Sequence, residues 1–192
     1  MYYSIIVLAF IPIISSLLLA YQTMRAGFNI WGVASISPKF LFYLGKGITM
    51  GVFILLVVSA IMPNFYWCFP GTIQDNIPSA QRALALVFLL AGNILLLPAQ
   101  YELSIFTRIG LPKGAHTLCT DGVYKISRNP MYMGLFFFFA ACFMLNPSLG
   151  VVLVLILCLL IHFAIIRSEE QFLTNHFGDK YIKYQANTAR FL

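Results

Sequence analysis

The sequence has very little charge and few of the residues from which metal sites are built. Only 9% of its 192 residues are charged, with 12 basic and 6 acidic side chains and 3 histidines. A soluble domain carries roughly 25% charged residues, so this composition excludes an ordinary soluble fold. The scarcity of histidine and acidic residues also argues against a metal site.

The cysteines lack the spacing of a functional group. Cys68, Cys119, Cys142 and Cys158 are scattered along the chain without a C-x-x-C pair. Two of them lie in apolar segments, where a free thiol behaves as a small hydrophobic side chain. They indicate neither a disulfide framework nor a metal centre.

The chain is instead rich in hydrophobic residues, which make up 60% of it. The long apolar stretches are Tyr3–Ala20, Gly47–Met62, Ala83–Ala99, Met131–Leu145 and Leu149–Ile166. A bilayer core of about 30 Å needs about 20 helical residues. The first and fifth stretches reach this length with their flanks, the second reaches it if it starts near Phe40 and includes Lys46, and the fourth is short. We therefore predict an all-α, polytopic membrane protein with about five transmembrane helices. We expect a single membrane domain over residues 1–192, with a three-helix part at 1–101 and a second part at 102–192.

The net charge of +6 follows membrane topology and does not indicate nucleic-acid binding. Basic residues gather in the first loop, the third loop and the tail, whereas residues 63–81 contain no lysine or arginine. The positive-inside rule then places the amino terminus outside and the third loop and carboxyl terminus in the cytoplasm. Lys46, at the end of the second helix, is expected to snorkel to the membrane surface. The expected partners are membrane lipids.

Two polar motifs flank the last two apolar segments. The first is GVYKISRNPMYMG at 122–134, and the second is Arg167-Ser168-Glu169-Glu170. The intervening segments meet at Asn146-Pro147, which predicts a helical hairpin that returns both motifs to one membrane surface. An alternative is that Arg167 pairs with Glu170 at i, i+3 within one helix.

The first motif contains a helix start. Pro130 suits the first turn of a helix, because its missing N–H would have no intrahelical partner there. The unpaired N–H groups of that turn and the charge of Arg128 together form a natural anion site. A snorkelling Arg128 is the alternative.

His162 and the tail complete the polar features. An ionisable group inside a membrane segment indicates function by default, although a packed, hydrogen-bonded His162 is an equal alternative. The tail at 171–192 sets aromatic residues among polar ones and predicts an amphipathic segment on the membrane surface, broken at Gly178.

These residues resemble the integral-membrane methyltransferases typified by isoprenylcysteine carboxyl methyltransferase and the phospholipid N-methyltransferases. The family pattern H-x-L-V-T-x-G-x-Y corresponds to residues 116–124, R-H-P-x-Y-x-G to 128–134, the Glu pair to 169–170 and F-G-x-x-Y-x-x-Y to 177–184. Asn129 stands where the family has histidine, so a mechanism that needs an imidazole there would fail. Asn129 could still position a cofactor by hydrogen bonds.

The resemblance implies S-adenosyl-L-methionine as methyl donor. The residues that would contact it are Lys113, His116, Thr117, Leu118, Cys119, Val123, Tyr124, Asn129, Pro130, Met131, Tyr132, His162 and Glu169. Glu169 suits the donor's amino group, the N–H groups of the fourth helix suit its carboxylate, and Tyr124 and Tyr132 favour its sulfonium.

The resemblance also implies a lipidic acceptor embedded in the membrane. A prenylcysteine-type carboxylate is our first expectation and a phospholipid amine the second. A carboxylate needs only a cation to orient it, for which Arg128 is the first candidate and Arg167 the second. An amine needs a base, for which His162 or Glu170 could serve.

Two other classes of protein remain open. One is a membrane sterol-type reductase that binds NADPH, and the other is a non-enzymatic membrane subunit or transporter. Binding of the donor would separate all three classes.

Overall fold

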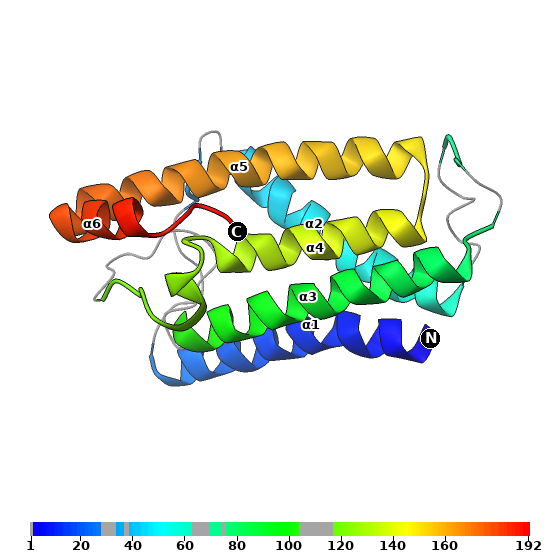
Figure 1. Ribbon diagram of the computed structural model, residues 1–192, viewed down its shortest axis with the longest axis horizontal. Helices are drawn as coiled ribbons and strands as arrows, with labels where there is room; N and C mark the ends of the chain where they lie inside the picture. The colour runs from blue at the N-terminus through cyan, green and yellow to red at the C-terminus, as the bar shows by residue number, and fades with distance from the viewer. Residues whose placement is uncertain (1, 28–33, 37–38, 63–69, 74–75, 104–116) are drawn as a thin grey trace.

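The chain folds as a bundle of helices (Figure 1). The computed structural model describes residues 2–27, 34–36, 39–62, 70–73, 76–103 and 117–192. In chain order the elements are α1 (Tyr2–Arg25), α2 (Lys39–Ile61), α3 (Ser79–Leu103), the 3₁₀ helix η3 (Gly122–Lys125), α4 (Pro130–Leu145), α5 (Leu149–Phe177) and α6 (Asp179–Asn187). These ranges contain no strand, so the predicted all-α fold is confirmed.

The membrane prediction is confirmed as well. In the described part of the chain 4 helices, α1, α2, α3 and α5, are long and apolar enough to cross a bilayer. The remaining apolar helix, α4, begins at Pro130 as expected and has 16 residues, or about 24 Å at 1.5 Å per residue. It is shorter than a bilayer core of about 30 Å, which agrees with the short fourth stretch of the sequence.

The helices alternate in direction along the bundle. Figure 1 shows that α1, α3 and α5 end at the side where α2 and α4 begin. We call this side the motif end, because Arg128 and Glu170 meet there, with 3.3 Å between Arg128 Nε and Glu170 Oε1. The predicted hairpin therefore does return the two motifs to one place.

Buried polar groups fix the turn of the hairpin. Asn146 is fully buried, donates from Nδ2 to the carbonyl of Cys142 at 3.0 Å and accepts from Ser59 Oγ at 2.8 Å. Ser148 caps α5 by accepting from the backbone N–H of Val151. Because these groups have partners, the turn between two apolar helices carries no unpaired side chain.

Two glycines bring α3 and α4 into backbone contact. A methyl group on Gly134 would lie 2.8 Å from Leu96 Cβ and 2.9 Å from the carbonyl oxygen of Gly92. A methyl group on Gly92 would lie 2.7 Å from the ring of Phe138. Such close crossings are typical of small residues in membrane helices, and this one explains the glycine that ends the first motif.

Replacing Gly134 with alanine should therefore destabilise the bundle by about 1–3 kcal/mol, because the added carbon would collide with backbone that cannot move aside. The measurement is the free energy of unfolding in mixed micelles. Gly47, on α2, is the matched control, since a methyl group there meets nothing within 4 Å. Equal stabilities of the two alanine variants would contradict the prediction.

A buried asparagine connects α3 to α1. Asn93 donates to the carbonyl of Leu8 on α1 at 3.0 Å and to that of Leu89 on its own helix at 2.8 Å. Gln100 adds a second connection, with hydrogen bonds to Ser15 and Ser16. These bonds hold α1 against the side of α3.

Candidate active site

The segment before α4 begins with a glycine whose backbone conformation other residues rarely adopt. Gly122 begins η3 with φ +54°, and its Cα faces Glu102 at the end of α3, so that a side chain at this position would meet the carboxyl group. A residue with φ in this range is normally glycine. The short helix then buries Tyr124, whose carbonyl accepts a hydrogen bond from the hydroxyl of Tyr184 at 2.6 Å. Gly122 and Gly134, the first and last residues of the motif, are therefore both required by close contacts with α3.

Glu170 is the centre of a charged network at the motif end. Its Oε1 accepts from Arg128 Nε at 3.3 Å and from Asn129 Nδ2 at 2.9 Å. Its Oε2 accepts from Arg190 Nε at 3.0 Å and Nη2 at 2.7 Å. The side chain of Glu170 is only 5% exposed, so this carboxylate is desolvated and its charge is balanced by two guanidinium groups.

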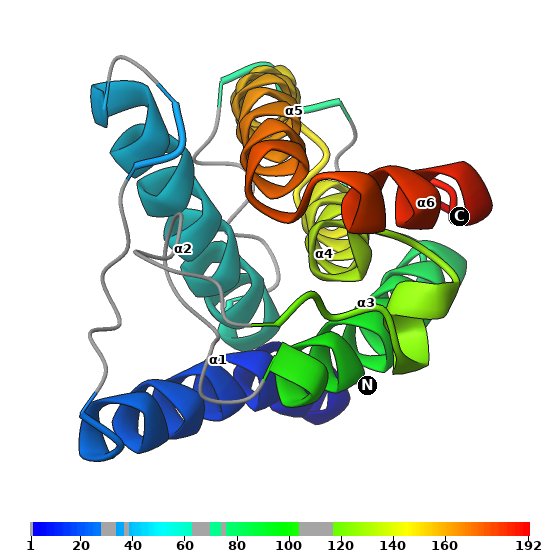
Figure 2. The same ribbon diagram turned by 90° about the vertical axis from the view of Figure 1, so that its left-hand side faces the viewer.

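The C-terminal tail contacts the start of α4. Arg128 donates from Nη1 to the carbonyls of Gln185 at 3.1 Å and Thr188 at 2.5 Å, and from its backbone N–H to Ala189 at 2.9 Å. Ser127 and Ala189 form a parallel bridge. The expected amphipathic segment exists as α6, which lies beside the start of α4 in the end-on view (Figure 2), and the residues after it run back toward α4 (Figure 1). The guanidinium of Arg128 therefore donates to one carboxylate and to two backbone carbonyls of the tail.

Glu170 does not form the ion pair with Arg167 within α5 that the sequence left open. Arg167 is exposed, and Glu170 pairs with Arg128 and Arg190 instead. The hydrogen bond to Glu170 raises the pKa of Arg190, so this tail residue stays protonated. Catalytic roles for Arg128, Arg167 and Glu170 remain predictions.

The neighbouring carboxylate, Glu169, belongs to a different cluster. The hydroxyl of Tyr132 lies 2.9 Å from both Oε1 and Oε2 of Glu169. Lys46, from α2, places Nζ 5.5 Å from the centre of the Tyr132 ring. His162 meets the same ring edge-on, with 5.8 Å between ring centres. This cluster joins α2, α4 and α5 in the interior of the bundle.

His162 is fully buried and hydrogen-bonded. Its Nδ1 lies 2.8 Å from the carbonyl oxygen of Cys158, and its Nε2 lies 3.3 Å from Thr49 Oγ1. Because a carbonyl can only accept, Nδ1 carries the proton of the first bond. The contacts are those of a packed histidine, and a role in binding the donor remains a prediction.

The other predicted donor contacts lie around these two clusters. Asn129 and Pro130 are buried at the start of α4, and Met131 is half-buried in its first turn. Before α4, Leu118, Cys119 and Val123 are partly buried and Thr117 is exposed. Lys113 and His116 lie outside the described residues. Burial raises the pKa of Cys119, so its thiol is a neutral packing group.

Sequence reasoning missed two cations. Arg190 lies in a tail that gave only an amphipathic pattern, and nothing in that pattern identified its carboxylate partner. Lys46 was expected to snorkel, yet its ammonium lies over the rings of Phe42 and Tyr132. The sequence did contain a signal for Lys46, because a lysine within an apolar helix usually marks a functional site.

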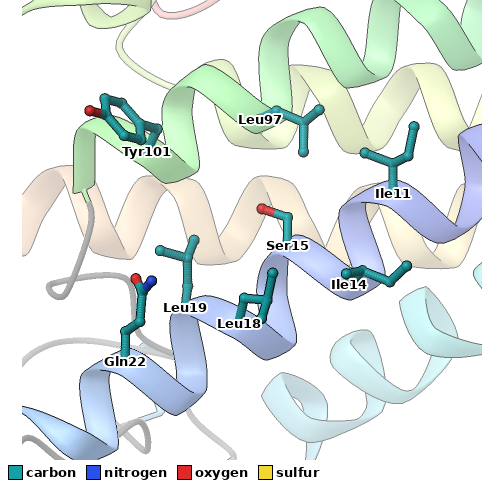
Figure 3. Close-up of a pocket in the computed structure, with 8 residues that line it drawn as sticks. All are labelled: Ile11, Ile14, Ser15, Leu18, Leu19, Gln22, Leu97 and Tyr101. Atoms are coloured by element: carbon teal, nitrogen blue, oxygen red, sulfur yellow. The ribbon is translucent and has the colours of Figure 1, made fainter.

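A separate pocket of about 440 Å³ lies between α1 and α3 (Figure 3). It is lined by Ile11, Ile14, Ser15, Leu18, Leu19, Gln22, Leu97 and Tyr101. None of these residues belongs to either motif. We therefore do not include the pocket in the candidate active site.

The apolar helices define a multi-pass membrane protein. The clusters around Glu169 and Glu170, at one end of the bundle, form its candidate active site. Residues 80–180 match the model of a protein family described as phospholipid methyltransferase. The match covers more than half of the chain, and the protein belongs to this family.

One curated relative extends the comparison. Over 121 residues the chain is 33% identical to the protein-S-isoprenylcysteine O-methyltransferase of Schizosaccharomyces pombe (strain 972 / ATCC 24843). The alignment covers 61% of this chain and 51% of the relative. The chain thus spans about half the length of the curated relative it matches. The predicted family resemblance is confirmed.

Proposed function

We propose that this protein transfers a methyl group from S-adenosyl-L-methionine to a lipidic acceptor embedded in the membrane. The observation that carries the proposal is the pair of Glu169 and Tyr132. Among the described residues, the only hydrogen-bond donor to the Glu169 carboxylate is the Tyr132 hydroxyl. A carboxylate has about four acceptor sites, so Glu169 has capacity left for the ammonium group of the donor.

The other residues around Glu169 fit the same molecule. The side chain of Asn129 donates to Glu170 and does not cap α4, which leaves the N–H groups of the first turn for the donor's carboxylate. The rings of Tyr124 and Tyr132 offer faces that stabilise a positive sulfonium. When bound, this donor supplies a methyl group that is already activated by the sulfonium.

His162, from the Glu169 cluster, and several residues outside both clusters would complete the donor site by analogy with the family. The residues outside the clusters are Lys113, His116, Thr117, Leu118, Cys119, Val123, Pro130 and Met131. In such a transfer the protein aligns the donor with the acceptor and excludes water. Tyr124 and Asn129 are buried, and they would exclude water from the donor.

The acceptor is a carboxylate of prenylcysteine type in our first proposal and a phospholipid amine in our second. The name of the curated relative supports the first, and the description of the family supports the second. Arg128 or Arg167 would orient a carboxylate, whereas His162 or Glu170 would take the proton from an amine. The basic residues gathered at the motif end favour a cytoplasmic active site with the amino terminus outside.

The test is calorimetric binding of S-adenosylhomocysteine to the wild-type protein in detergent. We expect a dissociation constant in the micromolar range, about −8 kcal/mol, and no competition from NADPH. Methyl transfer is then measured with N-acetyl-S-farnesylcysteine and with phosphatidylethanolamine. Binding of NADPH but not of S-adenosylhomocysteine to folded protein would overturn the proposal in favour of a reductase.

A further inference from the structure

We infer that Lys46 is a specificity-determining residue, which selects a lipid acceptor with a carboxylate over one with a cationic amine. The inference rests on the proposed function. Lys46 lies outside residues 80–180, which the family model matches. Its role must therefore be argued from the contacts of this chain.

The position of Lys46 follows from a close contact between α2 and α5. A methyl group on Gly45 would lie 2.6 Å from Ile161 Cγ2 and 3.8 Å from the ring of His162. The hydroxyl of Thr49, one turn further along α2, donates to the carbonyl of Gly45 at 2.9 Å and lies 3.3 Å from His162. These contacts hold this turn of α2 against the helix that carries Glu169.

The ammonium of Lys46 points at aromatic rings. Its Nζ lies 5.4 Å from the centre of the Phe42 ring and 5.5 Å from that of Tyr132. Across the described residues, Lys46 makes no hydrogen bond, and no carboxylate oxygen comes within the 4.0 Å of an ion pair. Ring faces stabilise a cation only partly, because they do not accept its hydrogen bonds strongly.

Glu169 does not neutralise Lys46 by direct contact. Its oxygens are turned to the hydroxyl of Tyr132, at 2.9 Å, and its remaining capacity is assigned above to the ammonium of the donor. The ring of Tyr132 contacts Lys46 and its hydroxyl contacts Glu169, so one side chain links a cation and an anion. The cluster thus offers a carboxylate for a positive ligand and an ammonium for a negative one.

The two arginines that could orient an acceptor are less suited. The guanidinium of Arg128 is occupied by Glu170 and two backbone carbonyls, and Arg167 is exposed. Lys46 remains as a cation whose N–H groups have no hydrogen-bond acceptor among the described residues, and it lies beside the predicted donor site. A carboxylate near it gains charge-assisted hydrogen bonds, whereas a protonated amine is repelled.

The reaction balances without a base for such an acceptor. A carboxylate oxygen forms the new bond to the methyl carbon as the bond from that carbon to sulfur breaks, and the electron pair stays on sulfur. No proton leaves the acceptor. A protonated amine acceptor would first have to lose a proton to a base. The ammonium of Lys46 cannot accept that proton, because it has no lone pair.

The experiment compares two ligands that carry the same prenyl group, N-acetyl-S-farnesylcysteine, whose carboxylate is charged, and its carboxamide, which is neutral. Binding to wild type, Lys46→Met and Lys46→Arg is measured in nanodiscs in the absence of the methyl donor. We expect wild type and Lys46→Arg to prefer the carboxylate by about tenfold or more, and Lys46→Met to bind both ligands about equally. In turnover, Lys46→Met should raise KM for the carboxylate about tenfold with a much smaller change in kcat.

Two controls make the result specific. Lys39→Met removes an exposed charge from the start of the same helix and should keep the preference. S-adenosylhomocysteine should bind Lys46→Met within about twofold of wild type. Lys46→Gln replaces the methionine variant if the latter does not fold.

The inference is overturned if the preference survives in Lys46→Met, if wild type shows none, or if the affinity for S-adenosylhomocysteine falls by the same factor as that for the carboxylate. Failure of the proposed function gives a different pattern. In that case wild type would not bind S-adenosylhomocysteine, while the comparison of carboxylate and carboxamide would still decide the role of Lys46.

Discussion

Replacing Glu170 with alanine should lower the free energy of unfolding by about 3–5 kcal/mol and release the tail from α4. The carboxylate is 5% exposed and accepts from Arg128, Asn129 and Arg190. Removing it leaves Arg128, itself only 10% exposed, as a buried charge without its counterion. Breaking one partner of such a pair costs more than the pair contributes, because the remaining charge has lost its water.

Hydrogen exchange of residues 179–192, with the unfolding midpoint in mixed micelles, would measure both effects. Arg167→Ala is the matched control, since Arg167 is a charged but exposed residue one turn away on the same helix. Arg190→Ala should show the same loss of protection with a smaller cost, because its side chain is 42% exposed. Unchanged protection of the tail in Glu170→Ala would show that the network does not hold it.

Replacing the adjacent Glu169 with alanine should lower the affinity for the donor more than it lowers the stability of the protein. We expect the affinity for S-adenosylhomocysteine to fall about 30-fold or more, since loss of one partner of a buried, hydrogen-bonded charge pair costs at least about 2 kcal/mol. The unfolding midpoint should change less than in Glu170→Ala, because the direct contact that Glu169 loses among the described residues is the bond from the Tyr132 hydroxyl, whereas Glu170 loses two arginine partners. Calorimetry and thermal unfolding of the same sample measure both quantities.

Tyr132→Phe is the control for Glu169→Ala. It removes the hydroxyl but leaves the carboxylate and the ring. Because the bond from this hydroxyl to Glu169 exists in the protein without the donor, only part of its energy enters the affinity, which should fall by about tenfold or less. If Glu169→Ala bound S-adenosylhomocysteine as tightly as wild type, the carboxylate would not hold the donor. If both variants lost binding equally, the hydroxyl would be the important group.

Much of the bundle could be predicted because membrane helices follow local rules. Apolar stretches of sufficient length gave α1, α2, α3 and α5, and Pro130 gave the start of α4 because proline suits that position in any helix. The approach of Arg128 to Glu170 also followed, since a hairpin must return its two ends to the same side of the bundle.

The tail could not be predicted in the same way. Many of its contacts with the first motif involve backbone groups. They include the backbone bond from Arg128 to Ala189, the bonds from the Arg128 side chain to tail carbonyls, and a short parallel bridge between Ser127 and Ala189. Backbone groups are the same in every residue, so they leave no pattern in the sequence. The amphipathic pattern found α6 but could not say where the residues beyond it go.

Lys46 shows a second limit. A lysine near a helix end is compatible with snorkelling and with an interior position, and its own helix does not distinguish them. The deciding contacts come from other helices, through the ring of Tyr132 and the close approach of Gly45 to Ile161. Tertiary packing of this kind is set by side chains far apart in the sequence.

The glycine contacts also restrict how a lipid can travel through the bundle. Gly92 and Gly134 leave no room for one added carbon between α3 and α4, and Gly45 leaves none against Ile161 between α2 and α5. A prenyl or acyl chain is at least as wide as a single methyl group, so it cannot slide through either seam at these depths. An acceptor that reaches Lys46 and Glu169 from the bilayer must use a different lateral opening, and residues that select its chain length should line that opening.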